Sequence, residues 1–151
     1  MTKKLETDLL YLLYDVARLM RTRADQRARR QHGMTRAQWV ILSWLERQSG
    51  ISQSDLAGLV EVEPITVCRL VDRLEARGLV ERRPDAKDRR VKRLHLTPKA
   101  KPVLDDIHAW RDALREEVTA GISDAALNTQ IDTLLRMKAN LAQSPMFAQA
   151  V

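Results

Sequence analysis

The segment between Ser52 and Gly78 predicts two short helices joined by a tight turn. Ser52-Gln53-Ser54-Asp55 has the pattern of a helix N-cap, and apolar residues at helical spacing follow it. Pro64 suits the first turn of the second helix, where its missing N–H costs no hydrogen bond, and Gly78 suits its end. Two helices at this spacing form a helix-turn-helix, so this segment constrains the fold more than any other feature of the chain.

A strongly basic stretch follows the two helices. Residues 82–93 contain seven cations and two aspartates, a local charge of +5 in a 151-residue chain whose formal net charge is +6. Apolar runs at 78–80 and 94–96 suit paired strands, which puts the basic residues on the loop of a hairpin. Such a loop fits a polyanion, because bound cations release counterions from phosphates, and the sequence predicts DNA as that partner.

Helical patterns occupy the rest of the chain. Thr35 heads a capping-box pattern, and a long helix is expected after the hairpin, beginning either at Thr97-Pro98 or only around Pro102. The terminal helices, 5–31 and 124–142, carry apolar stripes too long for a small core, so they need a partner surface. With 4% aromatic residues, five glycines and five prolines, the composition favours a mainly helical chain over a β-sandwich.

The order of these elements predicts a fold that is mainly α with a small β-hairpin wing, an α+β winged helix-turn-helix. A chain of this length suits one domain, here 1–151. Within it, residues 34–97 are expected to form the DNA-binding lobe, with helical regions at 1–33 and 98–151.

The second helix of the helix-turn-helix has a face suited to the major groove. At 100° per residue, five positions fall opposite its apolar side: Ile65, Thr66, Arg69, Arg73 and Ala76. Arg can donate two bonds to guanine, Thr can bond a base edge or a phosphate, and Ile can meet a thymine methyl. Asp72 is expected to hold the guanidinium of Arg69. The alternative is a charged helix face that meets only solvent.

The wing adds a second predicted contact with DNA. Arg89 or Arg90 is expected to enter a narrow minor groove, while Asp88 pairs with Arg90 and fixes the loop. The other cations of the stretch are expected to contact phosphates or to stay solvated: Arg82, Arg83, Lys87, Lys92 and Arg93. The predicted DNA-binding set is Gln53, Ser54, Ile65, Thr66, Cys68, Arg69, Arg73, Asp88, Arg89, Arg90 and Lys92.

Several motifs in this region resemble the MarR family of bacterial transcriptional regulators. The residues that carry the resemblance are Leu56-Ala57, Thr66 and the segments 69–75, 77–82, 88–90 and 94–97. Segments 99–102 and 120–123 resemble the SlyA branch of the family in particular. The resemblance implies a homodimer in which the regions 1–33 and 98–151 interleave across a two-fold axis. It also implies that two winged-helix lobes read a pseudo-palindrome, with half-sites roughly 10 base pairs apart.

The resemblance also implies a ligand site between the dimerisation helices and the DNA-binding lobe. Many relatives release DNA when a small aromatic anion binds there. Tyr11, Tyr14 and Arg18 on the first helix, with Trp39 on the second, offer ring contacts and a cation for a carboxylate or a phenolate. Aromatic residues at helical spacing equally suit a packed core, so the residues themselves leave both interpretations open.

No sequence pattern indicates catalysis, a metal site or a cofactor. His32, His95 and His108 are widely separated, and no Gly-rich phosphate loop is present. Two other functions stay open: a ligand-independent architectural DNA binder that acts as an anti-silencer, and a winged helix used for protein contacts. A redox switch at Cys68 is a third, although the chain has no second Cys to resolve a sulfenic acid.

The single cysteine and the lack of a long apolar segment also bear on location. One Cys rules out an internal disulfide framework, and the apolar stretch near the N-terminus is too short for export or for a membrane span. With the family resemblance, these features favour the bacterial cytoplasm and association with the nucleoid.

Overall fold

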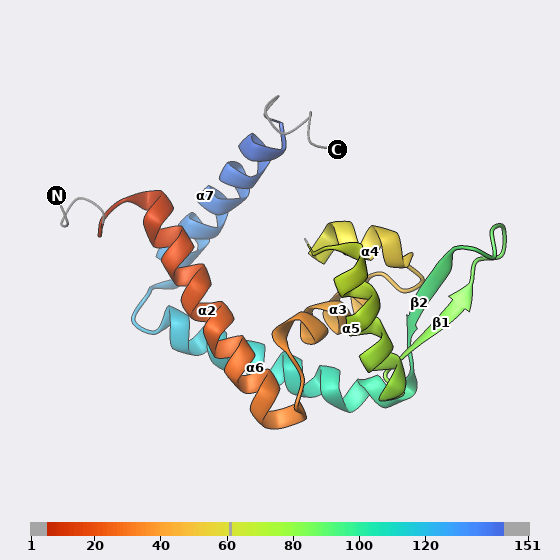
Figure 1. Ribbon diagram of the computed structural model, residues 1–151. Helices are drawn as coiled ribbons and strands as arrows, with labels where there is room; N and C mark the ends of the chain where they lie inside the picture. Colours follow the sequence, from red (N-terminus) through yellow and green to blue (C-terminus); the bar gives the residue numbers. More distant parts are fainter. Residues whose placement is uncertain (1–5, 61, 144–151) are drawn as a thin grey trace. The chain divides into compact units, whose positions relative to one another are not determined.

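The computed structural model describes residues 6–60 and 62–143 (Figure 1). Helices dominate this part of the chain, and the only strands in it form one antiparallel hairpin. The elements are α2 (Leu9–His32), α3 (Arg36–Arg47), α4 (Gln53–Val60), α5 (Pro64–Ala76), β1 (Val80–Pro84), β2 (Lys92–Leu96), the 3-10 helix η1 (Pro98–Ala100), α6 (Lys101–Thr119) and α7 (Asp124–Ala142). The predicted fold class, mainly α with a small β-hairpin wing, is confirmed.

The chain divides into two compact units, Met1–His108 and Ala109–Val151. No helix in the described ranges is long and apolar enough to span a membrane. The first expected helix start, Leu5, lies outside the described residues, and α2 begins after Asp8, whose side chain accepts a hydrogen bond from the Tyr11 backbone N–H at 3.0 Å.

Local capping signals determine where α3 and α4 begin. The Gln38 N–H donates to Thr35 Oγ1 at 3.3 Å, and the Thr35 N–H donates to Gln38 Oε1 at 2.9 Å, so the predicted capping box is complete. The Asp55 N–H donates to Ser52 Oγ at 3.0 Å, and that hydroxyl donates to Asp55 Oδ2 at 2.6 Å. These bonds satisfy backbone donors that have no partner inside a helix.

The second helix of the helix-turn-helix, α5, has Pro64 in its first turn, as predicted. It closes where Gly78 takes a φ of 71°, a left-handed conformation that a side chain would strain. The Leu79 N–H then donates to the Leu74 carbonyl at 3.0 Å. This turn sends the chain directly from α5 into β1.

The strands of the wing extend further toward the loop than the apolar runs predict. Val80 pairs with Leu96 at one end, and Pro84 pairs with Lys92 at the other. Four of the seven cations, Arg82, Arg83, Lys92 and Arg93, therefore lie on strands and not on the loop, which corrects the prediction that the basic residues project from a loop. The Leu94 N–H donates to the Ile51 carbonyl at 3.0 Å, which ties β2 to the segment just before α4.

The core of the first unit lies between α3, α4, α5 and the base of the wing. Its fully buried side chains include Ile41, Leu42, Leu45, Leu56, Val67, Val71, Leu74, Val80 and Leu94. Burying each of these apolar side chains contributes about 1.5–3 kcal/mol. Figure 1 shows the three helices grouped beside the hairpin, with the loop pointing away from them. The core therefore holds α5 and the wing on one lobe.

The long helix after the wing begins late, which resolves the alternative left open by Pro98 and Pro102. Residues Pro98–Ala100 form η1, and α6 begins only at Lys101. Thr97 makes no side-chain cap bond there, because its Oγ1 donates to the Gly78 carbonyl at 2.5 Å. Thr97 thus joins the end of the wing to the turn after α5.

Apolar stripes on the terminal helices stay exposed in the single chain. On α2 the large exposed side chains include Leu9, Leu12, Val16 and Leu19, the last with 51% of its surface exposed. In the second unit, α7 has no buried residue at all, and Ile131, Leu134, Leu135 and Leu141 are exposed. Soluble monomers rarely expose extended apolar stripes of this kind, so both stripes fit a partner surface.

Candidate nucleic-acid interface

One face of α5 is free of packing contacts with the core. Its buried side consists of Val67, Leu70, Val71 and Leu74. The predicted DNA-reading residues lie on the exposed side: Ile65, Thr66, Arg69 and Arg73. Ile65 is the clearest case, since 61% of a large apolar side chain is exposed in a helix whose other side is packed. Cys68 is half-buried between the two sides.

Asp72 does not hold Arg69, which corrects the sequence-based expectation. Its Oδ1 accepts from Arg82 Nη2 at 2.6 Å, so its partner comes from strand β1. The second nitrogen, Arg82 Nη1, donates to Glu75 Oε2 at 2.5 Å. Burial would lower the pKa of Arg82, but the hydrogen bonds to Asp72 and Glu75 outweigh burial and the pKa is raised.

Gln53 takes part in the same contacts. Its Oε1 accepts from Arg82 Nε at 3.1 Å, while the neighbouring Ser54 is exposed at the start of α4. Arg82 is therefore bound to side chains of its own lobe, where charge alone predicts a phosphate contact or a solvated flank.

Asp85 organises the loop of the wing, residues 85–91. Its Oδ1 accepts from the backbone N–H groups of Lys87 at 2.8 Å and Asp88 at 3.1 Å. Its Oδ2 accepts from Arg93 Nε at 2.7 Å. The Lys87 backbone bond, the Arg93 side-chain bond and the Asp88 backbone bond lower the pKa of Asp85 from 3.8 to about 2.

The prediction missed Asp85, although a signal for it was present in the sequence. An Asp that follows Pro and precedes a loop commonly bonds backbone N–H groups two or three residues later. That pattern occurs at Asp85, which follows Pro84.

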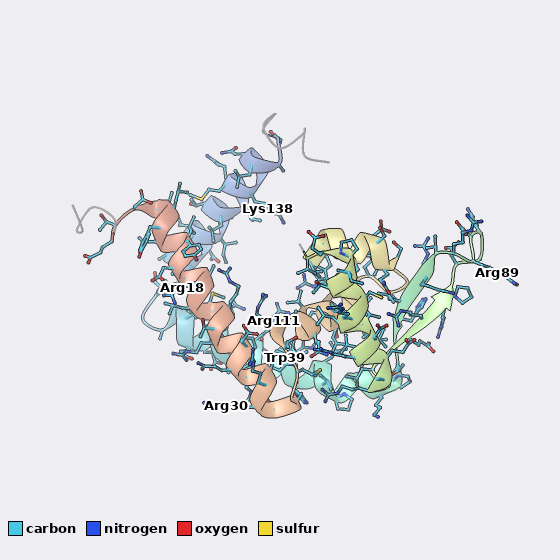
Figure 2. The ribbon with its side chains drawn as sticks, viewed as in Figure 1. Arg18, Arg30, Trp39, Arg89, Arg111 and Lys138 are labelled. Atoms are coloured by element: carbon cyan, nitrogen blue, oxygen red, sulfur yellow. The ribbon has the colours of Figure 1, made fainter. Side chains whose placement is uncertain are left out.

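Asp88 braces the loop, but through the backbone of Arg90 and not through its guanidinium. The Arg90 N–H donates to Asp88 Oδ1 at 3.0 Å, and the Val91 N–H donates to the Asp88 carbonyl at 3.0 Å. The guanidinium of Arg90 is not needed for this brace, and Arg90 is exposed. Figure 2 shows Arg89 at the tip of the hairpin, extending away from the lobe.

The cations of residues 82–93 thus fall into two groups. Arg82 and Arg93 are half-buried and bound to carboxylates of the same lobe. The exposed group comprises Arg83, Lys87, Arg89, Arg90 and Lys92, and among these Arg83 forms an ion pair with Glu81. Charge available to a polyanion is therefore concentrated at the loop and on the edge of β2.

The predicted effector residues lie in different surroundings. Tyr11 and Tyr14 are exposed on α2, and Arg18 on the same helix donates to Asp15 at 2.5 Å, which raises the pKa of Arg18. Trp39 is only 3% exposed and belongs to the core. Its ring meets His32 edge-on, with 6.1 Å between ring centroids. A ligand would reach Trp39 only if the core around it opened.

Each histidine has a local partner. His32 Nε2 lies 3.1 Å from Asp106 Oδ2, and His108 Nε2 lies 2.8 Å from Glu46 Oε2. His95 Nδ1 lies 3.1 Å from Ser49 Oγ. Across residues 6–60 and 62–143, no three His, Cys, Asp or Glu side chains are grouped so that they could hold a metal ion.

Known proteins are similar to this lobe in sequence and in structure. The model of the MarR family matches residues 34–92, which include α3, α4, α5 and most of the wing. The crystal structure of transcriptional regulator PA3341 is 38% identical, with a TM-score of 0.77 over 88% of this chain and 97% of that chain. The chain belongs to the MarR family.

Two further solved structures are similar to this MarR-family chain. Transcriptional regulator SlyA has a TM-score of 0.80 and 27% identity over 95% of this chain and 100% of that one. S. aureus MepR, solved in complex with DNA, has a TM-score of 0.74 and 25% identity, covering 90% of this chain and 98% of MepR. The chain therefore has the winged-helix fold of MarR-family transcriptional regulators, and the expected similarity to SlyA is confirmed.

Proposed function

We propose that this MarR-family chain regulates transcription by binding a specific site on double-stranded DNA as a homodimer. The observation that carries the proposal is that one lobe presents two separate surfaces for DNA. One is the exposed face of α5, and the other is the braced cationic loop 85–91. A helix of this width fits the major groove, and exposed arginines on a neighbouring loop fit the minor groove.

The residues divide by the contact we assign to them. On α5, Thr66, Arg69 and Arg73 contact base edges or phosphates, Ile65 meets thymine methyl groups, and Cys68 lies at the edge of this face. At the start of α4, Gln53 and Ser54 approach the phosphate backbone. On the wing, Arg89 and Arg90 enter the minor groove, Asp88 keeps their backbone in place, and Lys92 contacts phosphate.

The dimer part of the proposal is supported by the exposed stripes of α2 and α7. We assign residues 34–97 to the DNA-binding lobe and the regions 1–33 and 98–151 to dimerisation. A two-fold dimer buries the same stripe from each copy, so each exposed leucine on the stripe contributes to the stability of the dimer twice. Two lobes related by this axis would read a pseudo-palindromic operator. That MepR was solved with DNA also supports DNA as the partner.

The proposal also includes a small aromatic anion that binds the protein and makes it release the operator. Tyr11, Tyr14 and Arg18 supply exposed rings and a cation on α2. A ligand that favours a lobe spacing unsuited to successive major grooves would depopulate the DNA-binding form by its differential affinity. The alternatives to ligand control are a constitutive architectural DNA binder and a redox switch at the Cys68 thiol.

Fluorescence anisotropy with duplex DNA, single-stranded DNA and duplex RNA of equal length tests the proposal. We expect the duplex DNA to bind most tightly, and log K to fall with log[KCl] at a slope of about −5 or steeper, as for six or more phosphate contacts. Replacing Arg69 and Arg73 together by Ala should remove sequence preference while leaving the protein folded. Equal binding of all three nucleic acids contradicts the proposal. A double variant with unchanged preference also contradicts it and favours a winged helix used for protein contacts.

The same assay separates the three modes of control. Benzoate should release the wild-type complex if the chain senses aromatic anions, and the Arg18→Ala variant should respond less. Hydrogen peroxide should release wild type but not Cys68→Ser if the thiol is a switch. Binding unchanged by both reagents indicates a constitutive binder.

A further inference from the structure

Arg82 has more hydrogen-bond partners than any cation that the charge pattern assigns to DNA. Its Nε donates to Gln53 Oε1 at 3.1 Å, Nη1 donates to Glu75 Oε2 at 2.5 Å, and Nη2 donates to Asp72 Oδ1 at 2.6 Å. Nη2 also lies 3.4 Å from the carbonyl oxygen of Cys68. The backbone of Arg82 adds a bond, since its N–H donates to Glu75 Oε1 at 3.2 Å.

These contacts join three elements at one point. Gln53 is the first residue of α4, Asp72 and Glu75 lie in the last two turns of α5, and Arg82 is in the middle of β1. A guanidinium is planar and presents its donors in a rigid fork, so it fixes the directions of its partners as well as their distances. The strand that leads into the wing loop is thus fastened to the helix that carries Arg69 and Arg73.

Neighbouring Arg83 shows that this arrangement is specific to one side of the strand. Only 17% of the Arg82 side chain is exposed, whereas 59% of the Arg83 side chain is exposed. Arg83 forms an ion pair only with Glu81 on its own strand. Successive residues on a strand point to opposite faces, which explains the contrast. Arg82 could reach a phosphate only by giving up bonds to two carboxylates.

We propose that Arg82 is a positioning residue that sets the spacing between α5 and the wing loop, and so couples major-groove and minor-groove contacts without touching DNA. The inference rests on the proposed function, because it concerns how that DNA site is held together. Arg82 also offsets the negative charges of Asp72 and Glu75, which are exposed on α5 and would otherwise repel phosphates. Its loss therefore loosens the wing and places two unpaired carboxylates beside the DNA-binding face.

The test compares Arg82→Lys with Arg83→Lys, two substitutions that conserve charge on adjacent residues of β1. For each variant the dissociation constants for a selected operator and for a random duplex of equal length are measured over a range of KCl concentrations. We expect Arg82→Lys to reduce the ratio of the two affinities by about tenfold or more, since lysine cannot form the planar fork. The salt slope on random duplex should stay the same, and Arg83→Lys should keep the wild-type ratio.

Asp72→Asn gives a second readout, in which nonspecific affinity and the affinity ratio are expected to change in opposite directions. It removes one carboxylate charge, so affinity for random duplex should rise, yet the ratio of operator to random affinity should fall because Arg82 loses an ionic partner. This variant also keeps the inference testable if Arg82→Lys does not fold, as judged by circular dichroism.

Three results would overturn the inference. Arg82→Lys with the wild-type affinity ratio would show that Arg82 does not set specificity. A fall of about one in the salt slope for Arg82→Ala would make Arg82 a direct phosphate contact. Wild-type protein that prefers no duplex sequence would overturn the proposed function and this inference together, whereas the first two results leave the proposed function standing.

Discussion

Arg93 on β2 donates from Nε to Asp85 Oδ2 at 2.7 Å, and this pair closes the wing loop at its base. The same carboxylate accepts two backbone N–H groups from inside the loop. Asp85 therefore holds both the end of β2 and the first turn of the loop that carries Arg89 and Arg90. A loop held in this way presents its exposed arginines with less conformational entropy to lose on binding.

Replacing Asp85 by Asn should weaken operator binding by about tenfold, because the amide cannot accept three charge-assisted bonds and the loop becomes free to move. The change makes the protein more positive, so simple long-range electrostatics predicts tighter binding instead. Anisotropy titration at fixed salt distinguishes these opposite outcomes.

Asp105→Asn is the matched control for this charge change. Asp105 is exposed on α6 and pairs with Lys101 at 2.7 Å, so its loss changes net charge by the same amount without affecting the wing. Equal shifts in affinity for the two variants would show that the hydrogen bonds of Asp85 are irrelevant to DNA binding.

The carboxyl of Asp85 should titrate near pH 2, against an ordinary value of 3.8. Since the folded-state pKa is the lower one, the stabilisation is complete above about pH 4 and is lost as pH falls from 3.8 toward 2. Carbon-13 NMR titration of the aspartate carboxyls measures the value directly. In Arg93→Met the pKa should rise but stay below 3.8, because the Lys87 backbone bond, its largest cause, remains. An Asp85 pKa of 3.8 in the wild type would contradict this assignment.

Arg90→Ala should lower operator affinity by about 1–3 kcal/mol and relax the preference for A·T-rich sequence beside the recognition helices. The loop itself should persist, because Asp88 bonds the backbone N–H of Arg90, which alanine retains. Competition between operators with A·T-rich and G·C-rich flanks measures the effect. Arg30→Ala on α2 removes the same charge outside the wing and should leave flank preference unchanged. Wild-type affinity in Arg90→Ala would exclude a minor-groove role for this residue.

Leu19→Glu should dissociate the homodimer, raising its dissociation constant by about 100-fold or more. Each copy loses the burial of a leucine and buries a charge in its place, and both occur twice at a two-fold interface. Sedimentation velocity over a range of protein concentrations gives the result. Gln48→Glu adds the same charge at an exposed position of the 34–97 lobe and should leave the dimer intact. A wild-type chain that sediments as a monomer at micromolar concentration would contradict the dimer proposal.

Features set by neighbouring residues could be predicted from the sequence. The start of α3 follows from the capping box at Thr35, and α7 spans Asp124–Ala142, the range that its apolar spacing indicates. The helix-turn-helix and the presence of the wing also follow from local signals, because caps, Pro64 and Gly78 each act within one helical turn.

Pairings between distant residues could not be predicted in this way. Asp72 has the spacing to pair with Arg69 on its own helix, but the hairpin brings Arg82 closer to it in space. Trp39 has the spacing of either a pocket or a core residue, and its burial in the folded chain shows that it is in the core. Such contacts depend on how separate elements pack, β1 against α5 in one case and α2 against α3 in the other, which periodicity along the chain does not specify.

Selection of binding sites from a pool of random duplex DNA tests the central claim most directly. If the chain is a dimeric reader, the enriched sequences should share a pseudo-palindrome whose half-sites are separated by roughly 10 base pairs, one helical turn. Wild type should enrich it, and the Arg69→Ala, Arg73→Ala double variant should not. A pool that stays unenriched, or that yields a single half-site without a symmetric partner, would contradict the account.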